Sequence, residues 1–329
     1  MKAILAGLGE AGLGWYERLR SRELLLAVVE KNPVRKEKLR DTSIPFYTSL
    51  EEALEVEIRP DFVVNVTSPA AHTSVNNAAF DRGLPVLCEK PISFDYAESL
   101  EIVARAEREG IPFMIAENYR HFPYIRKLKA LLDSGVIGEL SAVEIAFRRY
   151  HRVKRDYAIA VLDDIGVHHI DLLRYLTGRE GSAVQAGMFN PFSGWQEEGA
   201  VLQTMAIIEL EGSIPVHYSA TIASRGPMTP WCGDWRIEGT TGALLLEGGA
   251  IHIYSGDAYT AITEFNDMPQ SDALTEFLAS LAEGREAETS ASDYLRTQAI
   301  VHYTIMAAKS GMRTTIELPA KEGMRHAGI

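Results

Sequence analysis

The sequence predicts an α/β protein with a doubly wound parallel sheet in its N-terminal part and an α+β domain with an open, mainly antiparallel sheet in its C-terminal part. Up to about residue 117, short apolar runs alternate with helical stretches, which is typical of a parallel sheet covered by helices. Beyond residue 134, longer alternating segments follow one another through short turns that contain glycine, which indicates antiparallel strands. We therefore expect one domain over residues 1–120 and a second over residues 121–329.

The strands of the predicted parallel sheet are short runs of consecutive apolar residues, without the alternation of apolar and polar residues that a half-exposed strand shows. Both faces of such a strand are expected to be buried, and a helix connects each strand to the next. The runs are KAILAG, LLLAVVE, DFVVNVT, PVLCE and PFMIAE, and the helical stretches between them include GLGWYERLRS, SVNNAAFDRG and DYAESLEIVARAEREG.

The second domain begins with an amphipathic helical stretch over residues 123–134 and continues with alternating segments. Residues 162–173 interrupt the strands with a helical pattern, and further helices are expected near residues 271–284 and 291–310. The expected strands lie in LSAVEIAFRRY, AVLQTMAIIELEG, IPVHYSATIAS and DWRIEGTTGALLLEGGAIHIY.

Composition and charge limit the possible functions. The chain has 329 residues, of which 46% are hydrophobic and 24% charged, and its formal net charge is −12. An acidic protein is a poor general partner for nucleic acid or an anionic membrane surface. Cys88 and Cys232 match no metal-binding spacing, and neither a signal peptide nor a membrane span is apparent. We expect reduced thiols in a cytoplasmic protein.

A glycine-rich loop follows the first predicted strand and opens the first helix. Gly7, Gly9 and Gly12 give the spacing GxGxxG, and Glu10 and Ala11 lie within it. At such a turn the helix N-terminus offers free N–H groups and partial positive charge to a pyrophosphate, and the glycines let the backbone come close. The alternative is a tight turn that needs glycine only for its conformation. We favour dinucleotide binding.

The end of the second strand carries the acid that this fingerprint requires. Glu30 lies about 20 residues after the glycine loop, where a carboxylate hydrogen-bonds the ribose 2′-hydroxyl of NAD. Because a carboxylate repels a 2′-phosphate, we predict NAD as the cofactor. NADP stays open, since Lys31 and Arg35 could offer cationic contacts if Glu30 turned aside.

Glu89, Lys90 and Pro91 follow another apolar strand. In an open parallel sheet this is the carboxyl edge, where ligands bind. A lysine at that edge can donate a hydrogen bond or carry a proton. The alternative is a surface lysine before a turn proline, and the position favours the functional interpretation.

Six motifs follow one another along the whole chain. They are GLGEAG, NVTSPAAH (65–72), CEKP (88–91), ENYRHFP (117–123), LDDIGVHHIDLL (162–173) and the tail FLASLAEGREAETSASDYLRTQAIV. This ordered set resembles the family of glucose-fructose oxidoreductases, inositol dehydrogenases and rhizopine-catabolism oxidoreductases. The resemblance implies a Rossmann domain, an α/β domain with an open sheet, and a nicotinamide cofactor lying between them. It also implies a homodimer or homotetramer formed through the C-terminal sheet.

The same resemblance assigns residues to the cofactor and the substrate. The segment TSPAAH would line the cofactor, and three further residues would lie near the nicotinamide ribose or the substrate. Tyr119 and Arg120 of ENYRHFP join the predicted substrate set. The cofactor set outside the glycine loop and the Glu30 region is Thr67, Ser68, Pro69, His72, Glu89, Lys90 and Asn118.

The segment LDDIGVHHIDLL concentrates ionisable side chains in an apolar helix. At helical spacing Asp164, His168 and Asp171 fall on nearly one stripe, and His169 turns away. The resemblance selects Asp164 and His168 as catalytic, with Lys90, and rejects the neighbouring Asp163. His168 would take the hydroxyl proton, because an imidazole ordinarily titrates near pH ~6.5.

In this scheme Lys90 would hydrogen-bond the developing alkoxide, and Asp164 would bind the reacting or a neighbouring hydroxyl and favour the useful state of His168. Two alternatives stand beside it. In the first, Asp163 or Asp164 caps the helix N-terminus and the histidines are hydrogen-bonded residues of the core. We favour this structural role for His169 and Asp171. The other is a divalent metal on the shared face, and we expect no metal.

Substrate clues are weaker. The glycine-rich run that relatives usually carry before the catalytic aspartate is replaced by RDYAIAVLDD. The basic segment at residues 147–157 could hold a carboxylate or phosphate through Arg148, or it could be a solvated strand face. Trp231 and Trp235 could stack on a sugar or belong to the core.

Together these features predict an NAD-dependent dehydrogenase that acts on a secondary hydroxyl of a sugar, polyol or sugar derivative. Two alternatives are open. A lyase or glycosidase could recycle bound NAD with no net formation of NADH, and a nicotinamide-binding sensor could lack turnover.

Overall fold

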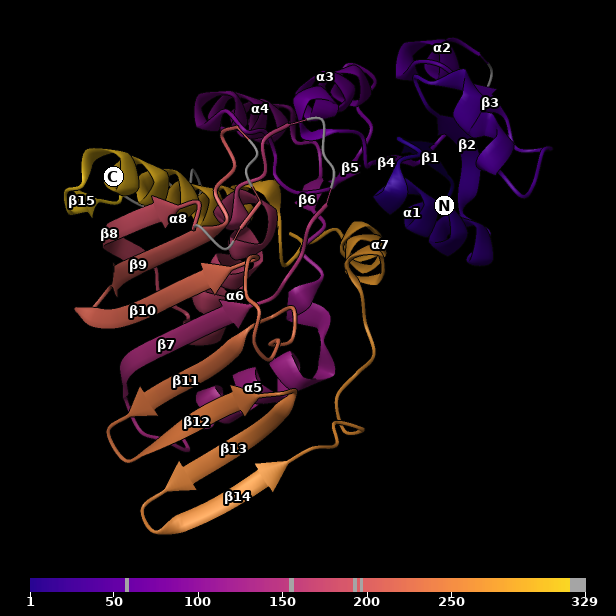
Figure 1. The fold of residues 1–329 in the computed structure, drawn as a ribbon. Coiled ribbons are helices and arrows are strands. Elements are labelled where there is room, and N and C mark those ends of the chain that lie inside the picture. Colours follow the sequence, from indigo (N-terminus) through magenta and orange to yellow (C-terminus); the bar gives the residue numbers. More distant parts are fainter. Residues whose placement is uncertain (57–58, 154–156, 192–193, 196–197, 320–329) are drawn as a thin grey trace, which may run out of the picture. The chain divides into compact units, whose positions relative to one another are not determined.

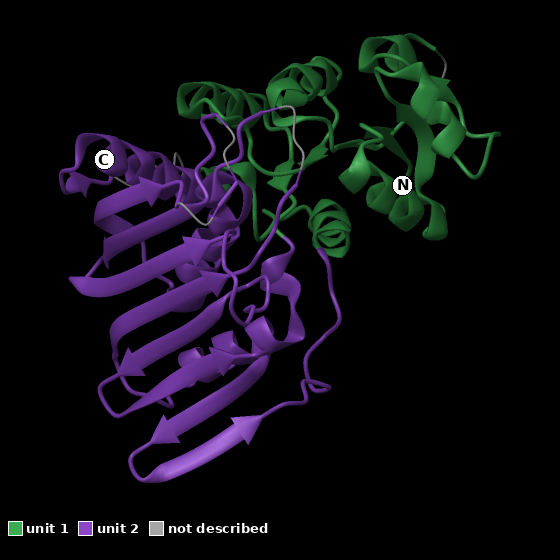
Figure 2. Ribbon diagram, in the orientation of Figure 1, with its two compact units in different colours: residues 1–117, 273–295 green, residues 118–272, 296–329 purple. Residues whose placement is uncertain are grey.

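The computed structural model describes residues 1–56, 59–153, 157–191, 194–195 and 198–319. The chain divides into two compact units (Figure 2). Unit 1 consists of residues 1–117 and 273–295, and unit 2 consists of residues 118–272 and 296–329. Neither unit is one continuous stretch, because the chain returns to unit 1 after it has formed strands β7 to β14 of unit 2 and then goes back to unit 2.

Unit 1 is built on a six-stranded sheet in the order β3-β2-β1-β4-β5-β6. Every strand pair in it is parallel. Four consecutive buried residues form β1, and four form β4, so these central strands are covered on both faces. The strands are β1 Ala3–Ala6, β2 Leu25–Val29, β3 Phe46–Tyr47, β4 Phe62–Asn65, β5 Val86–Cys88 and β6 Phe113–Ile115.

Helices cover the sheet of unit 1 on both faces (Figure 1). On one face α1 and α7 share a core with the strands, and the ring of Phe277 lies 5.5 Å from that of Phe62. This packing explains why residues 273–295 belong to unit 1. The helices of unit 1 are α1 Glu10–Ser21, η1 Pro33–Lys38 (a 3-10 helix), α2 Leu50–Glu55, α3 Pro69–Phe80, α4 Tyr96–Glu109 and α7 Ala273–Glu283.

Unit 2 is built on a nine-stranded sheet in the order β14-β13-β12-β11-β7-β10-β9-β8-β15. Its pairs are antiparallel except for β7 and β10, which run parallel. The predicted fold class is therefore confirmed in both parts. The strands are β7 Leu140–Arg148, β8 Gly181–Phe189, β9 Gln203–Leu210, β10 Ile214–Thr221, β11 Asp234–Gly239, β12 Gly242–Glu247, β13 Ala250–Ser255, β14 Ala258–Ile262 and β15 Thr314–Thr315.

The two faces of this sheet differ in burial along the strand register. Residues that pair directly across the strands share a face. One such row contains Ile208, Val216, Val143 and Ile237, all buried. The next row contains Ile207, His217, Glu144 and Arg236, all exposed in the single chain. Helices therefore cover only one face, and the other faces away from them (Figure 1).

The helices of unit 2 include an irregular turn. Residues 162–166 form a π-helical turn, closed by the Val167 N–H donating to the Leu162 carbonyl, and α6 continues from it without a break. The sequence pattern predicts a regular helix over residues 162–173, whereas the structure begins this helix with a π-helical turn. The helical elements are η2 Tyr119–His121 (3-10), α5 Pro123–Asp133, η3 Leu162–Gly166 (π), α6 Val167–Thr177 and α8 Ala291–Ser310, whose first turns belong to unit 1.

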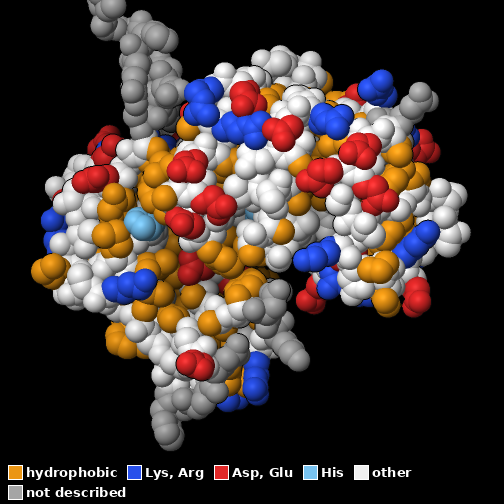
Figure 3. Space-filling model, turned by 90° about the horizontal axis from the view of Figure 1, so that it is seen from above, with side chains coloured by type: hydrophobic (Ala, Val, Ile, Leu, Met, Phe, Trp, Pro, Cys, Tyr) orange, Lys and Arg blue, Asp and Glu red, His pale blue; other side chains and the backbone are white. Residues whose placement is uncertain are grey.

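The distribution of surface charges and the hydropathy of the helices agree with the composition. Acidic and basic side chains are interspersed over the face that Figure 3 presents. Among the described helices, none is both long and apolar enough to cross a membrane.

Candidate active site

The predicted site residues fall in both units, and each unit is described by itself. In unit 1 the three glycines of the loop have different roles. Gly7 has φ +101°, and a Cβ there would lie 2.6 Å from the Val66 carbonyl carbon. A Cβ at Gly12 would lie 2.4 Å from the Gly7 oxygen. These two glycines therefore let α1 pack against β1 and β4.

Gly9 is the glycine that leaves room for a ligand. A Cβ there would meet only the Arg35 guanidinium, at 3.8 Å. Gly9 is the N-cap of α1 and provides no side-chain cap, and Glu10 and Ala11, the first residues of the helix, are exposed. Bare backbone at an uncapped helix N-terminus fits a dinucleotide pyrophosphate.

Glu30 lies at the end of β2, as the sequence predicts, and is only 7% exposed. Its Oε2 accepts hydrogen bonds from the Leu8 N–H at 2.8 Å and the Arg35 Nη1 at 3.0 Å, and its Oε1 accepts from the Asn32 N–H at 2.9 Å. Burial alone would raise the pKa of Glu30, but these donors outweigh it and lower the pKa. Glu30 thus holds the glycine loop, and Lys31 is exposed beside it.

The segment at the start of α3 divides into surface and buried residues. Ser68, the N-cap of α3, is exposed, and Thr67 and Pro69 are half-buried. His72 is only 1% exposed, and its ring nitrogens contact the carbonyl oxygens of Pro91 at 2.7 Å and Thr67 at 3.2 Å. Burial lowers the pKa of His72. The structure places His72 as a link between two loops rather than on a surface that a cofactor could line.

The loop after β5 carries Glu89 and Lys90, both half-buried. The Trp15 Nε1 donates a hydrogen bond of 2.8 Å to Oε1 of Glu89, and the Arg18 guanidinium lies 4.6 Å from the centroid of the Trp15 ring. Together with the contact of His72 to Pro91, this bond fixes the loop from two sides. Sequence reasoning missed Trp15, which reads as an apolar core position of α1.

In unit 2, η3 and α6 carry the predicted catalytic pair. Asp164 and His168 are both half-buried, as is Asp163. The imidazole of His168 stacks on the ring of Tyr119, with centroids 4.3 Å apart and an interplanar angle of 20°. A Cβ at Gly166 would lie 2.6 Å from the Tyr218 hydroxyl, so glycine lets this turn approach β10.

His169 has a different environment from its neighbour. It is fully buried, with Nδ1 3.1 Å from the Tyr218 hydroxyl and Nε2 2.9 Å from the Trp231 carbonyl oxygen. Burial lowers the pKa of His169 to about 4. This is the satisfied core histidine that the sequence analysis favours for this position.

Two predicted substrate residues, Arg120 and Arg148, are engaged with protein carboxylates. Arg120 is 6% exposed and forms a bidentate ion pair with the buried Asp171, at 2.6 and 2.7 Å. Arg148 is exposed, with its Nη2 3.4 Å from Oδ2 of Asp234. Asn118, the N-cap of η2, is half-buried.

The other substrate clues separate in the structure. Trp235 is 1% exposed and belongs to the core, whereas Trp231 is 38% exposed and carries the Arg149 guanidinium 4.4 Å from its ring centroid. Lys154 and Arg155 of the basic segment lie outside the described residues. Within the described part of the chain, no group of three His, Cys, Asp or Glu residues could hold a metal ion.

A parallel sheet whose first strand leads through an open glycine turn into a helix N-terminus is typical of dinucleotide-binding proteins. Residues 2–117 match the oxidoreductase family with an NAD-binding Rossmann fold, and residues 125–245 match the GFO/IDH/MocA C-terminal domain. The chain belongs to the GFO/IDH/MocA oxidoreductase family, which confirms the resemblance. Unit 1 contains its NAD-binding Rossmann domain.

Individual proteins extend this finding. The chain is 26% identical to a D-apiose dehydrogenase of Paraburkholderia graminis over 80% of this chain and 74% of that protein. It is 31% identical to an inositol 2-dehydrogenase of Mycolicibacterium gilvum over 56% of this chain and 54% of that protein.

Solved structures share the fold. An oxidoreductase from Agrobacterium radiobacter in complex with NAD+, L-tartaric acid and magnesium matches with a TM-score of 0.85 and 21% identity, over 96% of this chain and 98% of that chain. A levoglucosan dehydrogenase in complex with NADH and levoglucosan matches with a TM-score of 0.83 and 19% identity, over 96% of this chain and 99% of that chain.

Proposed function

We propose that this protein is a dehydrogenase that transfers a hydride between a nicotinamide and a secondary hydroxyl of a sugar, polyol or sugar derivative. The observation that carries the proposal is that two adjacent histidines differ in exposure. His169 is fully buried, whereas His168 is half-buried and its ring stacks on Tyr119. The relatives named for apiose and inositol support the substrate class.

The residues divide the work of alcohol oxidation. When bound, NAD would supply the acceptor for the hydride and its electron pair. His168 takes the hydroxyl proton as general base, and Lys90 donates a hydrogen bond to the oxygen as negative charge develops on it. Asp164 accepts a hydrogen bond from the reacting or a neighbouring hydroxyl.

The remaining cofactor residues have supporting roles in this proposal. The pyrophosphate would lie at the N–H groups of Gly9, Glu10 and Ala11, and Thr67, Ser68 and Pro69 would line the dinucleotide. Of the predicted substrate residues, Tyr119 would contact the substrate next to His168.

We propose NAD rather than NADP as the physiological cofactor. The Glu30 carboxylate keeps negative charge where a 2′-phosphate would have to bind, and three donors hold it there. Arg35 is the group that could instead pair with a 2′-phosphate, but it hydrogen-bonds Glu30.

We also propose a homodimer or homotetramer formed through the uncovered face of the sheet of unit 2. The side chains exposed there in the single chain include Met205 (42%), Ile207 (58%), Tyr254 (42%) and Tyr259 (56%). Large apolar side chains on one sheet face favour burial against a second copy.

A cytoplasmic location is the last part of the proposal. Cys88 and Cys232 are buried and form no disulfide. Burial raises the pKa of both thiols, that of Cys232 to about 11, so both stay protonated and unreactive at neutral pH.

The test is steady-state formation of reduced cofactor, followed by absorbance, with a panel of polyols, aldoses, sugar acids and nucleotide sugars. We expect turnover with at least one of them and its loss in His168→Ala and Lys90→Ala. The matched control is His302→Ala, which removes a half-buried histidine of α8 outside the proposed site and should leave turnover unchanged. Cofactor that co-purifies without net NADH formation would instead support a cofactor-recycling lyase or glycosidase. NAD binding without any turnover would support a sensor.

A further inference from the structure

Two successive residues of η2 contact two residues of α6 that lie about one turn apart. The ring of Tyr119 stacks on the His168 imidazole, and the Arg120 guanidinium pairs with the Asp171 carboxylate. His168 and Asp171 are three residues apart, so they lie on the same side of the helix. The dipeptide Tyr119-Arg120 therefore contacts this side of α6 at two points.

The ionic contact has a fixed geometry. Nε of Arg120 donates to Oδ2 of Asp171 at 2.7 Å, and Nη2 donates to Oδ1 at 2.6 Å. A planar guanidinium bound through two donors has little freedom to rotate. Asp171 is fully buried and Arg120 nearly so, which excludes the solvent that would weaken the pair.

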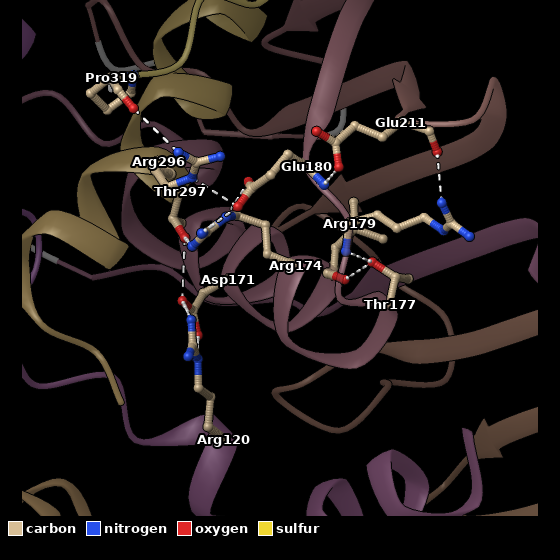
Figure 4. Close-up of polar contacts among 11 residues, drawn as sticks. Arg120, Asp171, Arg174, Thr177, Arg179, Glu180, Glu211, Arg296, Thr297 and Pro319 are labelled. Carbon is tan, nitrogen blue, oxygen red and sulfur yellow. Dashed lines mark hydrogen bonds and ion pairs between the residues drawn. The ribbon is translucent and has the colours of Figure 1, made fainter. Parts of the chain in front are cut away.

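Asp171 is also fixed from a third element. Thr297 of α8 donates from Oγ1 to Oδ1 of Asp171 at 3.2 Å, and Nη1 of Arg174 donates to the same Thr297 hydroxyl at 2.9 Å. Figure 4 shows Arg120 and Thr297 reaching Asp171 from different elements. The carboxylate is thus a junction between η2, α6 and α8.

The backbone next to His168 explains why such fixing matters. The π-helical turn of residues 162–166 leads directly into α6, and it lacks the regular hydrogen bonding of an α-helix. Side-chain contacts must therefore contribute to holding His168. A displacement of a reacting group by about 1 Å costs about a hundredfold in rate.

We propose that Arg120 and Asp171 are positioning residues, which fix the His168 imidazole by holding Tyr119 against it. The inference rests on the proposed function, in which His168 is the general base. It changes the role of Arg120 from the substrate contact that the sequence analysis predicts to a support behind the base.

The test combines kinetics with a measurement that needs no turnover. Ring stacking shifts the NMR signals of His168, which can be assigned among the nine histidines of the chain by their loss in His168→Gln. In Asp171→Asn and Tyr119→Leu we expect this shift to collapse and kcat to fall about tenfold or more, with NAD affinity unchanged. Tyr119→Phe keeps the ring, so it should keep the shift of the His168 signal, and in Arg120→Lys this shift should fall between that of the wild type and that of Tyr119→Leu.

Glu276→Gln is the matched control. Glu276 of α7 is 8% exposed and accepts two hydrogen bonds from Arg285, so this change weakens a carboxylate–arginine pair that involves neither η2 nor α6. We expect a lower melting temperature with an unchanged His168 signal and unchanged kcat. If Asp171→Asn does not fold, Tyr119→Leu and Arg120→Lys decide the question, since neither leaves a buried carboxylate without a cation.

Three results would overturn the proposal. They are an unchanged His168 signal in the folded variants, a lost signal with full kcat, and an Arg120→Lys enzyme that differs only in the KM for the alcohol. The last result would return Arg120 to the substrate. If the wild type oxidises no alcohol, the proposed function fails, and the NMR arm still decides whether the pair orients His168.

Discussion

The indole Nε1 of Trp15 donates a hydrogen bond of 2.8 Å to the carboxylate of Glu89, which precedes Lys90 and lies 74 residues away in sequence. The bond joins the first helix to the loop that carries the proposed alkoxide donor. An unpaired carboxylate oxygen in a half-buried loop can move toward water and take Lys90 with it.

Trp15→Phe keeps the aromatic packing and removes this donor. We expect kcat/KM for the alcohol to fall about threefold to tenfold, and the free energy of unfolding to fall by about 1 kcal/mol. Kinetics and chemical denaturation measure the two effects. An enzyme with unchanged kcat/KM would show that Lys90 does not depend on this bond.

The second prediction separates the glycines of the loop. Gly9→Ala adds a Cβ that meets only Arg35 at 3.8 Å, so the protein should keep its melting temperature and lose about tenfold or more in NAD affinity. Gly12→Ala puts a Cβ 2.4 Å from the Gly7 oxygen, so it should destabilise the fold itself. Thermal melts and NAD titration compare the two variants. Full NAD affinity in Gly9→Ala would contradict the proposed pyrophosphate site.

Much of unit 1 follows from local sequence, because continuous apolar runs and glycine spacing are read over a few residues. The same holds for His168, which the motif singles out. Contacts between distant segments could not be predicted in this way. Arg120 and Asp171 pair across 51 residues, and Phe277 packs against Phe62 after strands β7 to β14 of unit 2 have intervened in the chain. Neither the parallel pairing of β7 with β10 nor the π-helical turn produces a periodic pattern of apolar residues from which it could be predicted.

Cofactor preference gives the third prediction. The wild type should use NAD at least about tenfold better than NADP by kcat/KM, because Glu30 repels a 2′-phosphate. Glu30→Gln should reduce this ratio. Arg35→Ala should lower only the kcat/KM measured with NADP. Kinetics with both cofactors measure the ratios. A wild type that prefers NADP would show that Arg35 leaves Glu30 when the cofactor binds.

The fourth prediction concerns acid stability. The folded-state pKa of His169 lies at about 4, below its ordinary 6.5, so the unfolded chain binds more protons between these values. Stability from this group is complete above pH 6.5 and is lost as the pH falls to about 4. The loss is roughly 3 kcal/mol. Burial lowers the pKa of His72 as well, which adds to the loss in the same direction.

His169→Gln keeps hydrogen-bonding groups at this position without a titrating ring. Its free energy of unfolding should therefore change less between pH 7 and pH 5 than that of the wild type. Denaturation curves at each pH measure the difference. Parallel pH dependences for the two proteins would rule out His169 as the titrating group.

The last prediction tests the uncovered face of the sheet. Ile207 is 58% exposed in the single chain and lies in a row with His217 and Glu144, so a lysine there has room and should not disturb the fold. If this face joins copies of the chain, Ile207→Lys would bury a charge in the contact and shift the protein toward the monomer. Val34→Lys changes a residue of unit 1 that is 66% exposed and serves as the control. Light scattering after gel filtration measures the mass. A monomeric wild type would show that there is no such contact. An Ile207→Lys oligomer as stable as that of the wild type would show that the contact lies elsewhere.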